Sequence, residues 1–212
     1  MSVRDEYNEK LANTVIGNLK KRQIEAFYCP SAAQARDKAL SFVKEGDRVS
    51  FGGSMTLEET GILEALRNRG DIRLIDRANA GNPQEMKQVF RDALSADCYF
   101  MSTNALTEDG ELVNIDGNGN RLAALIYGPD QVVIVTGMNK VVPNVEDAVR
   151  RVRHTATPLN CIRLNRNTPC ASTGTCADCL ASDCICNQVV ITRRSGNPDR
   201  IKVILVGEAL GY

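Results

Sequence analysis

The stretch QVVIVTGMNK, residues 131–140, decides the fold class. Val132 to Thr136 is an apolar, β-branched run of the kind found in strands buried on both faces of a sheet. A short polar loop follows, and Asn144 with Asp147 then caps a helix that we expect to reach about His154. A buried strand that leads through a short loop into a capped helix is the repeating unit of a parallel α/β sheet.

The same unit recurs on both sides of this stretch. Cap residues mark the helix starts, as Asn82 does before Pro83. The pattern predicts an α/β fold with a parallel, layered sheet covered on both faces by helices, in a single domain over residues 1–212. The expected strands are 26–29, 48–51, 72–75, 97–102, 111–115, 132–136, 189–193 and 201–206. The expected helices are about 7–19, 31–43, 56–70, 82 onward, 120–127 and 144–154.

Composition narrows the class of protein. The 212 residues are 43% hydrophobic and 25% charged, which is ordinary for a globular domain. Lysine plus arginine equals aspartate plus glutamate at 26 each, so the basic excess of a nucleic-acid-binding protein is missing. No apolar run is long enough for a membrane span, and the start MSVRDEYNEK has no apolar signal core. We therefore expect a cytoplasmic protein with no nucleic-acid partner; nothing in the sequence sets its oligomeric state.

Polar loops follow several of the expected strands. In open α/β sheets, ligands bind beyond the carboxyl ends of the strands, and glycines next to a helix start let a ligand approach the backbone. We expect these loops to form one pocket for a small anionic metabolite. The alternative is that the GGS segment is an ordinary tight turn and that the two cations are solvated or paired with acids. The candidate residues are Gly52, Gly53, Ser54, Thr56, Asn104, Thr107, Glu108, Asn120, Arg121 and Lys140.

Three stretches resemble the lactate-utilisation (LUD) domain family, of the lactate-utilisation protein C type. They are SFGGSMTLEETGI (50–62), the long and specific run from STNALTEDG to TGMNKVV (102–142), and RIKVILVGEALGY (200–212). The resemblance implies a fold like that of ribose-phosphate isomerase, glucosamine-phosphate deaminase and CoA-transferase. It also implies a part in lactate oxidation together with iron–sulfur partner proteins. The small partner subunits of this family often lack a cysteine cluster, so this chain resembles a stand-alone branch.

Six of the eight cysteines lie within 26 positions, in a cysteine-rich insertion at about 158–188. Because a cytoplasmic protein keeps its thiols reduced, the cluster favours a metal site over disulfides. Four thiolates complete either a zinc site or an iron–sulfur cluster. The resemblance favours iron–sulfur and the ligands Cys170, Cys176, Cys179 and Cys186, with Cys184 and Cys161 as spares. Zinc is the alternative cofactor, and reduced, packed thiols are the alternative to any metal.

Two classes of function therefore stay open. The first is a redox-associated protein, an oxidoreductase component of lactate or small organic-acid utilisation, with an iron–sulfur cluster and an iron–sulfur partner protein. The second is a non-redox ligand-binding or group-transfer protein of the sugar-phosphate or CoA-ester type, with a structural zinc site. In either class we expect 201–206 to be a buried strand and Glu208, just beyond it, to lie near the ligand or in solvent.

Overall fold

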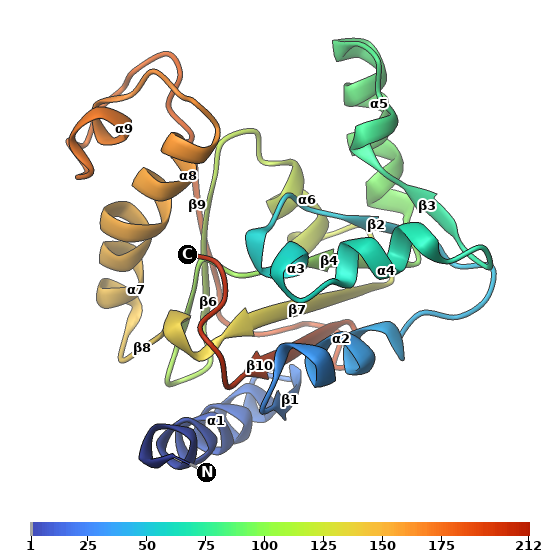
Figure 1. The fold of residues 1–212 in the computed structure, drawn as a ribbon, viewed down its shortest axis with the longest axis vertical. Helices are drawn as coiled ribbons and strands as arrows, with labels where there is room; N and C mark the ends of the chain where they lie inside the picture. Colours follow the sequence, from blue (N-terminus) through green and yellow to red (C-terminus); the bar gives the residue numbers. More distant parts are fainter. Residues whose placement is uncertain (1) are drawn as a thin grey trace.

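The computed structural model describes residues 2–212 and is built around a six-stranded sheet in which every strand pairing is parallel. The strand order is β1-β10-β7-β4-β2-β3, so β7, the strand within residues 131–140, lies near the middle (Figure 1). The predicted layered, parallel α/β fold class is confirmed. The strands are β1 (Glu25–Cys29), β2 (Arg48–Phe51), β3 (Arg73–Ile75), β4 (Cys98–Met101), β7 (Gln131–Gly137) and β10 (Ile201–Val206).

Helices cover both faces of this sheet because its strands are apolar on both sides. In β7, Val132 and Ile134 pack toward one face, and Val133 and Val135 toward the other. The first face is covered by α1 (Val3–Lys21), α6 (Asn120–Ile126) and a second, smaller sheet. The second face is covered by α2 (Ala32–Leu40), α3 (Met55–Glu59) and α4 (Ile62–Asn68). Between β3 and β4 the chain forms η1 (Arg77–Asn79), α5 (Pro83–Asp92) and η2 (Ala93–Ser95).

The second sheet departs from the sequence-based expectation of one parallel sheet. Its order is β8-β5-β6-β9, and both the β5–β6 and β6–β9 pairings are antiparallel. The cause is the turn at Asp109-Gly110, where Gly110 has a φ of +88° and joins β5 to β6 as a hairpin. So short a connection cannot join parallel strands. The strands are β5 (Ala105–Thr107), β6 (Leu112–Asp116), β8 (Val141–Val142) and β9 (Gln188–Thr192); β5 and β8 were not predicted.

The helix predicted over 56–70 is two helices. Gly61, at a φ of +73°, ends α3 and starts α4 in a conformation that other residues rarely adopt. The cap of α3 is Ser54, whose hydroxyl accepts from the Leu57 N–H at 3.4 Å, so the helix begins one residue before the predicted start at 56. Thr56 is instead inside the helix and buried, which leaves its hydroxyl available for a tertiary contact.

One long helical segment packs against the outer face of the small sheet. It runs from α7 (Val145–Arg151) through a π-helical turn, η4 (Val152–Ala156), into α8 (Thr157–Arg163), and so extends beyond the predicted end near His154. The short helix α9 (Pro169–Thr173) follows within the cysteine-rich region, and the turn η3 (Met138–Lys140) joins β7 to β8. No helix in residues 2–212 combines the length and the apolar character that crossing a bilayer requires.

Candidate functional site

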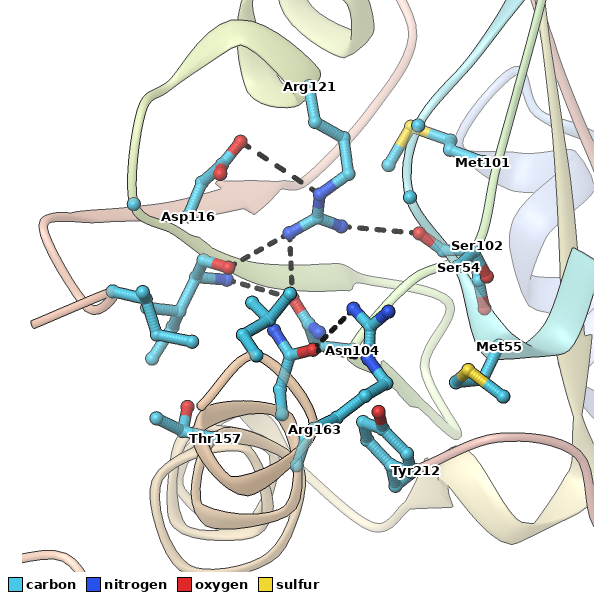
Figure 2. A pocket seen from close by; sticks show the side chains of 18 of the residues that line it. Ser54, Met55, Met101, Ser102, Asn104, Asp116, Arg121, Thr157, Arg163 and Tyr212 are labelled. Atoms are coloured by element: carbon cyan, nitrogen blue, oxygen red, sulfur yellow. Dashed lines mark hydrogen bonds and ion pairs between the residues drawn. The ribbon is translucent and has the colours of Figure 1, made fainter. Parts of the chain in front are cut away.

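A polar cavity of about 250 Å³ opens where the carboxyl ends of β2 and β4 meet the small sheet and α8 (Figure 2). This is the edge at which ligands bind in parallel α/β folds. The structure brings eight of the ten predicted pocket residues to its wall. They are Gly52, Gly53, Ser54, Thr56, Asn104, Asn120, Arg121 and Lys140.

The other two predicted pocket residues lie away from the cavity. Thr107 and Glu108 were placed in one loop with Asn104, but β5 intervenes and carries them to its far end. There the Thr107 hydroxyl accepts from the Glu111 N–H at 2.9 Å, and the Glu108 N–H donates to the Val142 carbonyl at 2.8 Å. The first contact lies within the β5–β6 hairpin, and the second joins its turn to β8. Glu208 is also outside the cavity wall: it is exposed, and its carboxylate accepts from the Ala32 N–H at 3.1 Å.

Lys140 is the buried cation of the cavity. Its side chain comes from η3 at the end of β7, and the residue is only 3% exposed. Its ammonium donates to Oγ1 of Thr56 at 2.8 Å and to Oγ of Ser102 at 3.2 Å. Among residues 2–212 no carboxylate forms an ion pair with it. Keeping a charged ammonium out of water among neutral partners is unfavourable. The free energy of such a buried lysine falls when it binds an anion or loses a proton.

The surroundings of Lys140 favour loss of that proton. Burial lowers its pKa to about 7, and the positive charges of Arg151 and Arg121 act in the same direction. The carboxylate of Glu59 opposes them. Near neutral pH the side chain is therefore divided between ammonium and amine, which is the state required of a lysine that exchanges protons or acts as a nucleophile.

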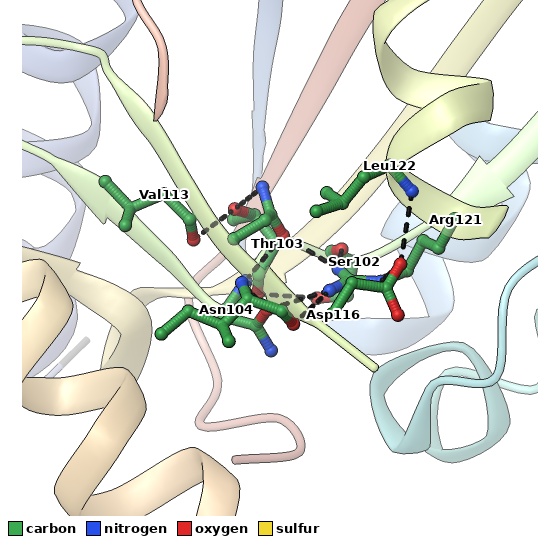
Figure 3. Close-up of polar contacts among 9 residues, drawn as sticks. Ser102, Thr103, Asn104, Val113, Asp116, Arg121 and Leu122 are labelled. Carbon is green, nitrogen blue, oxygen red and sulfur yellow. Dashed lines mark hydrogen bonds and ion pairs between the residues drawn. The ribbon is translucent and has the colours of Figure 1, made fainter. Parts of the chain in front are cut away.

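Arg121, in contrast, is a structural clamp and is not left open for an anion. One terminal nitrogen donates to Oδ1 of Asn114 at 2.7 Å and to the Ser102 carbonyl at 3.3 Å. The other donates to Oδ1 of Asn104 and to the Ile115 carbonyl, both at 2.9 Å. Figure 3 shows this network between the end of β4 and β6. The terminal donors of Arg121 therefore already serve the protein, and its part in binding an anion stays a prediction that rests on its charge.

The same network fixes Asn104. Its side-chain oxygen accepts from Arg121 and from the Ile115 N–H at 3.1 Å, and its backbone N–H donates to Asn114 at 3.1 Å. Asn114 is fully buried and also donates to Oγ1 of Thr103. These bonds hold the loop after β4 against β6, which positions Ser102 beside Lys140. Asn104 thus shapes the cavity wall, and its amide oxygen is used by the protein.

Additional cations line the cavity that sequence reasoning missed. Arg77 follows β3 and lies over the glycine loop, because a Cβ on Gly53 would be 2.5 Å from its Nη2 atom. Arg163 and Arg166 come from the end of α8 and the loop after it. Among the described lining residues there are five basic side chains and one acidic one, Asp116. The cavity therefore has the electrostatic character of an anion site.

The chain's C-terminal third also supplies wall residues that were not predicted. Thr157, Asn160 and Arg163 share one face of the helix α8, and their three-residue spacing was a usable sequence signal. Tyr212 had no local signal. Its ring lies near Arg163 in Figure 2, and its buried hydroxyl has no hydrogen-bond partner in the described part of the chain. Burial raises the pKa of this hydroxyl, and the positive charge of Arg163 opposes the shift.

The cysteine-rich region adjoins the cavity. The Cys186 thiol donates to Oγ1 of Thr157 at 3.5 Å, and Thr157 and Ile185 both line the cavity. Burial raises the pKa of the Cys161 thiol to about 11, and the neighbouring thiols of Cys170 and Cys186 also raise it. Burial likewise raises the pKa of Cys186 to about 11, with Cys184 and Cys170 as further causes.

These pKa shifts indicate that Cys170 and Cys186, two of the four expected metal ligands, lie close to the expected spares Cys161 and Cys184. Cys176 and Cys179 are half-buried in the segment after α9, and neither contributes to those pKa shifts. Across residues 2–212, no three Cys, His, Asp or Glu side chains are arranged to hold a metal ion. The predicted ligand set is thus not assembled as a coordination site.

Fold and cavity together define a layered α/β protein with a basic cavity at the carboxyl ends of its parallel strands. The chain belongs to the LUD domain family, whose model matches residues 12–206. The family is named for lactate utilisation, and membership supports a general role in the use of lactate or related organic acids. Comparison with curated proteins gave no match.

Solved structures agree with this assignment at the level of fold. A protein of the DUF162 family from Deinococcus radiodurans is similar over 94% of this chain and 98% of its own, at 14% identity and a TM-score of 0.54. A D-ribose-5-phosphate isomerase, in complex with phospho-erythronic acid, matches 52% of this chain and 53% of its own, at 13% identity and a TM-score of 0.35. The eIF2B delta protein from Chaetomium thermophilum matches 68% and 55%, at 19% identity and a TM-score of 0.33. The last two scores are too low to carry an argument.

Proposed function

We propose that the chain binds a small anionic metabolite, a carboxylate or a phosphate, in the cavity around Lys140, as part of lactate or small organic-acid utilisation. One observation carries the proposal: Lys140 is buried at the cavity wall with two hydroxyl partners and no paired carboxylate among residues 2–212. Keeping an ammonium out of water is costly unless an anion pairs with it. A bound anion at the cavity supplies that charge.

The wall supports the same conclusion. Arg77 and Arg163 both border the cavity, one beside the glycine loop and the other on α8. Arg121 contributes its charge at short range although its terminal donors are used within the protein. The side chains of Asn118 and Asn120 also face the site. An anion with a polar body, such as a hydroxy acid, suits a wall of this composition.

Calorimetric titration tests this proposal. L-lactate, D-lactate and inorganic phosphate are titrated separately into the full chain, into Lys140→Met and into Lys10→Met. Lys10 is the matched control, because it is 75% exposed and pairs only with Glu6 on the surface of α1. We expect at least one of the anions to bind wild type and Lys10→Met, and its binding to be lost in Lys140→Met. Equal affinity in all three proteins, or no binding to wild type, overturns the proposal.

We further propose that the cysteine-rich region holds an iron–sulfur cluster, which would make the protein redox-associated and in need of an iron–sulfur partner protein. The supporting observation is position: Cys186 contacts Thr157, and Thr157 lines the anion cavity. Thiolate is the ligand type that iron–sulfur clusters use, so the donor chemistry fits. Since the thiols do not form a coordination site as arranged, no step of the anion-binding proposal depends on a metal.

Metal analysis of protein purified without oxygen tests this second proposal. Iron with acid-labile sulfide and a broad visible absorption supports the redox class. Zinc in stoichiometric amount without colour favours the alternative, a ligand-binding or group-transfer protein with a structural zinc site. Absence of both metals, with all eight cysteines titrating as thiols, removes the cluster proposal.

A further inference from the structure

The nitrogen of Lys140 has two of its positions filled by hydroxyl oxygens that can only accept. The Thr56 hydroxyl gives its hydrogen to the Leu210 carbonyl at 3.3 Å, and the Ser102 hydroxyl gives its hydrogen to the Thr103 carbonyl at 3.3 Å. A hydroxyl has one hydrogen, so both oxygens turn a lone pair toward Lys140. They match the two N–H bonds of a neutral amine.

The remaining position of that nitrogen has no partner in the protein. Among residues 2–212 the only groups that hydrogen-bond to the Lys140 nitrogen are those of Thr56 and Ser102. The side chain borders the cavity, so the remaining direction of the tetrahedral nitrogen is left for a bound molecule. In the ammonium form that direction carries a third N–H, and in the amine form it carries the lone pair.

We propose that Lys140 forms a reversible Schiff base with a small 2-oxo acid bound in the cavity. This inference rests on the proposed anion-binding function and names the class of ligand. A 2-oxo acid carries a carboxylate for the basic wall beside a carbonyl carbon for the amine. A cavity of about 250 Å³ is of a size for such a compact acid. Dehydrogenation of a 2-hydroxy acid gives a 2-oxo acid, so the ligand is consistent with organic-acid utilisation.

The reaction balances without an oxidant or reductant. The nitrogen lone pair forms a bond to the carbonyl carbon, and the C=O π electrons move to the oxygen, which takes a proton from the nitrogen. The resulting carbinolamine loses water as the C=N bond forms, and the imine then takes up one proton. The pKa of Lys140, lowered to about 7 by burial and by Arg151 and Arg121 against the pull of Glu59, keeps amine available near neutral pH.

Borohydride trapping tests the inference. The full chain is incubated with pyruvate, as the smallest 2-oxo acid probe, and reduced with sodium borohydride. Intact mass and peptide mapping then locate the adduct. We expect one adduct on the peptide that contains Lys140. Its net gain in mass equals the acid less one oxygen atom, because condensation removes one water and reduction adds two hydrogens. Lys10→Arg is expected to be trapped as wild type is, and Lys140→Arg to lose the adduct.

Parallel titration of lactate, which has no carbonyl carbon, separates this inference from the proposed function. Lactate binding without a trapped pyruvate adduct overturns the Schiff base and leaves anion binding standing. If no adduct is trapped and neither enantiomer of lactate nor phosphate binds, both proposals are overturned. An adduct spread over exposed lysines, with no preference for Lys140, also overturns the inference. Peptide mapping of the wild-type chain decides the question even if Lys140→Arg fails to fold.

Discussion

The Lys140 ammonium lies 2.8 Å from Oγ1 of Thr56, although the two residues are 84 positions apart in the chain. Lys140 is the last residue of η3, which follows β7, and Thr56 lies in α3, which begins just beyond the end of β2. The parallel sheet brings both strand ends to one edge. The contact therefore joins two loops that sequence reasoning had linked only by their position after strands, and the following predictions start from it.

Anion affinity is expected to fall as pH rises through about 7, because the Lys140 ammonium loses its proton there. A bound anion stabilises the ammonium and so moves the midpoint upward. Calorimetry with lactate or phosphate at about pH 6 and about pH 8.5 measures the effect. Lys10→Met should show the same fall. An affinity that stays constant across this range in the wild-type chain contradicts the assignment.

The free energy of unfolding also depends on the titration of Lys140, but it should rise with pH where anion affinity falls. The pKa of Lys140 is about 7 in the folded protein and 10.5 as an ordinary lysine, so between these values the unfolded chain binds more protons. The Lys140 contribution to stability therefore increases with pH over this window. Buried thiols such as Cys98, whose pKa is raised by burial, act the other way. Urea denaturation of wild type and Lys140→Met at about pH 7 and about pH 9 isolates the lysine, and a pH-independent difference between the two would be the contrary result.

Arg121→Lys is expected to destabilise the fold by about 3 kcal/mol, because a lysine cannot replace the forked donors that hold Asn104 and Asn114. Arg150→Lys is the matched control. That arginine is 68% exposed and pairs only with Glu146 along one helix, so its loss should change stability by under about 0.5 kcal/mol. Chemical denaturation measures both. Equal stability of the two variants shows that Arg121 is not a clamp.

Gly137→Ala is expected to displace the segment from Gly207 to Tyr212. A Cβ at residue 137 would lie 2.7 Å from the Glu208 carbonyl and 2.7 Å from the Leu210 nitrogen, both backbone atoms. Since the Leu210 carbonyl accepts from Thr56, a partner of Lys140, and Tyr212 lines the cavity, anion affinity should fall together with stability. Hydrogen exchange of the tail and calorimetry report the two effects.

Gly17→Ala is the opposite case and serves as its control. Gly17 lies inside α1, and a Cβ there meets nothing within 4 Å. The substitution should raise the free energy of unfolding by about 0.5–1 kcal/mol and leave anion affinity unchanged. If both alanine variants behaved alike, steric contact with the tail would not be the cause of the first effect.

Substitution of single cysteines is expected to distinguish the metal ligands from the other thiols. If a metal is found, Cys170→Ser and Cys186→Ser should each reduce its content, because both residues belong to the expected ligand set and both thiols raise the pKa of the Cys161 thiol nearby. Cys98→Ser, in the buried strand β4, should leave the metal content of the folded protein unchanged. Comparison of Cys161→Ser with Cys176→Ser then decides between the sequence-based set and one in which Cys161 is a ligand.

Local sequence was sufficient for the main sheet. The strands at 48–51 and 201–206 were predicted with the observed bounds, because a short apolar run between turn and cap signals predicts a buried strand. The glycine loop and Lys140 were placed at one edge for a general reason: parallel strands that follow helices end at the same edge of the sheet. These features depend on neighbours a few residues away, which a single sequence displays.

What only the tertiary structure decided are the contacts between distant segments. The β5–β6 hairpin placed Thr107 and Glu108 away from the cavity, and the network of Asn104, Asn114 and Arg121 uses the terminal donors of an expected ligand cation within the protein. Tyr212 joined the cavity without any local pattern to indicate it. Side-chain hydrogen bonds depend on which groups meet in space and on burial, and burial also sets the pKa of Lys140. Sequence therefore determined which strand ends gather at the site, and three-dimensional packing determined which of their side chains remain available to a ligand.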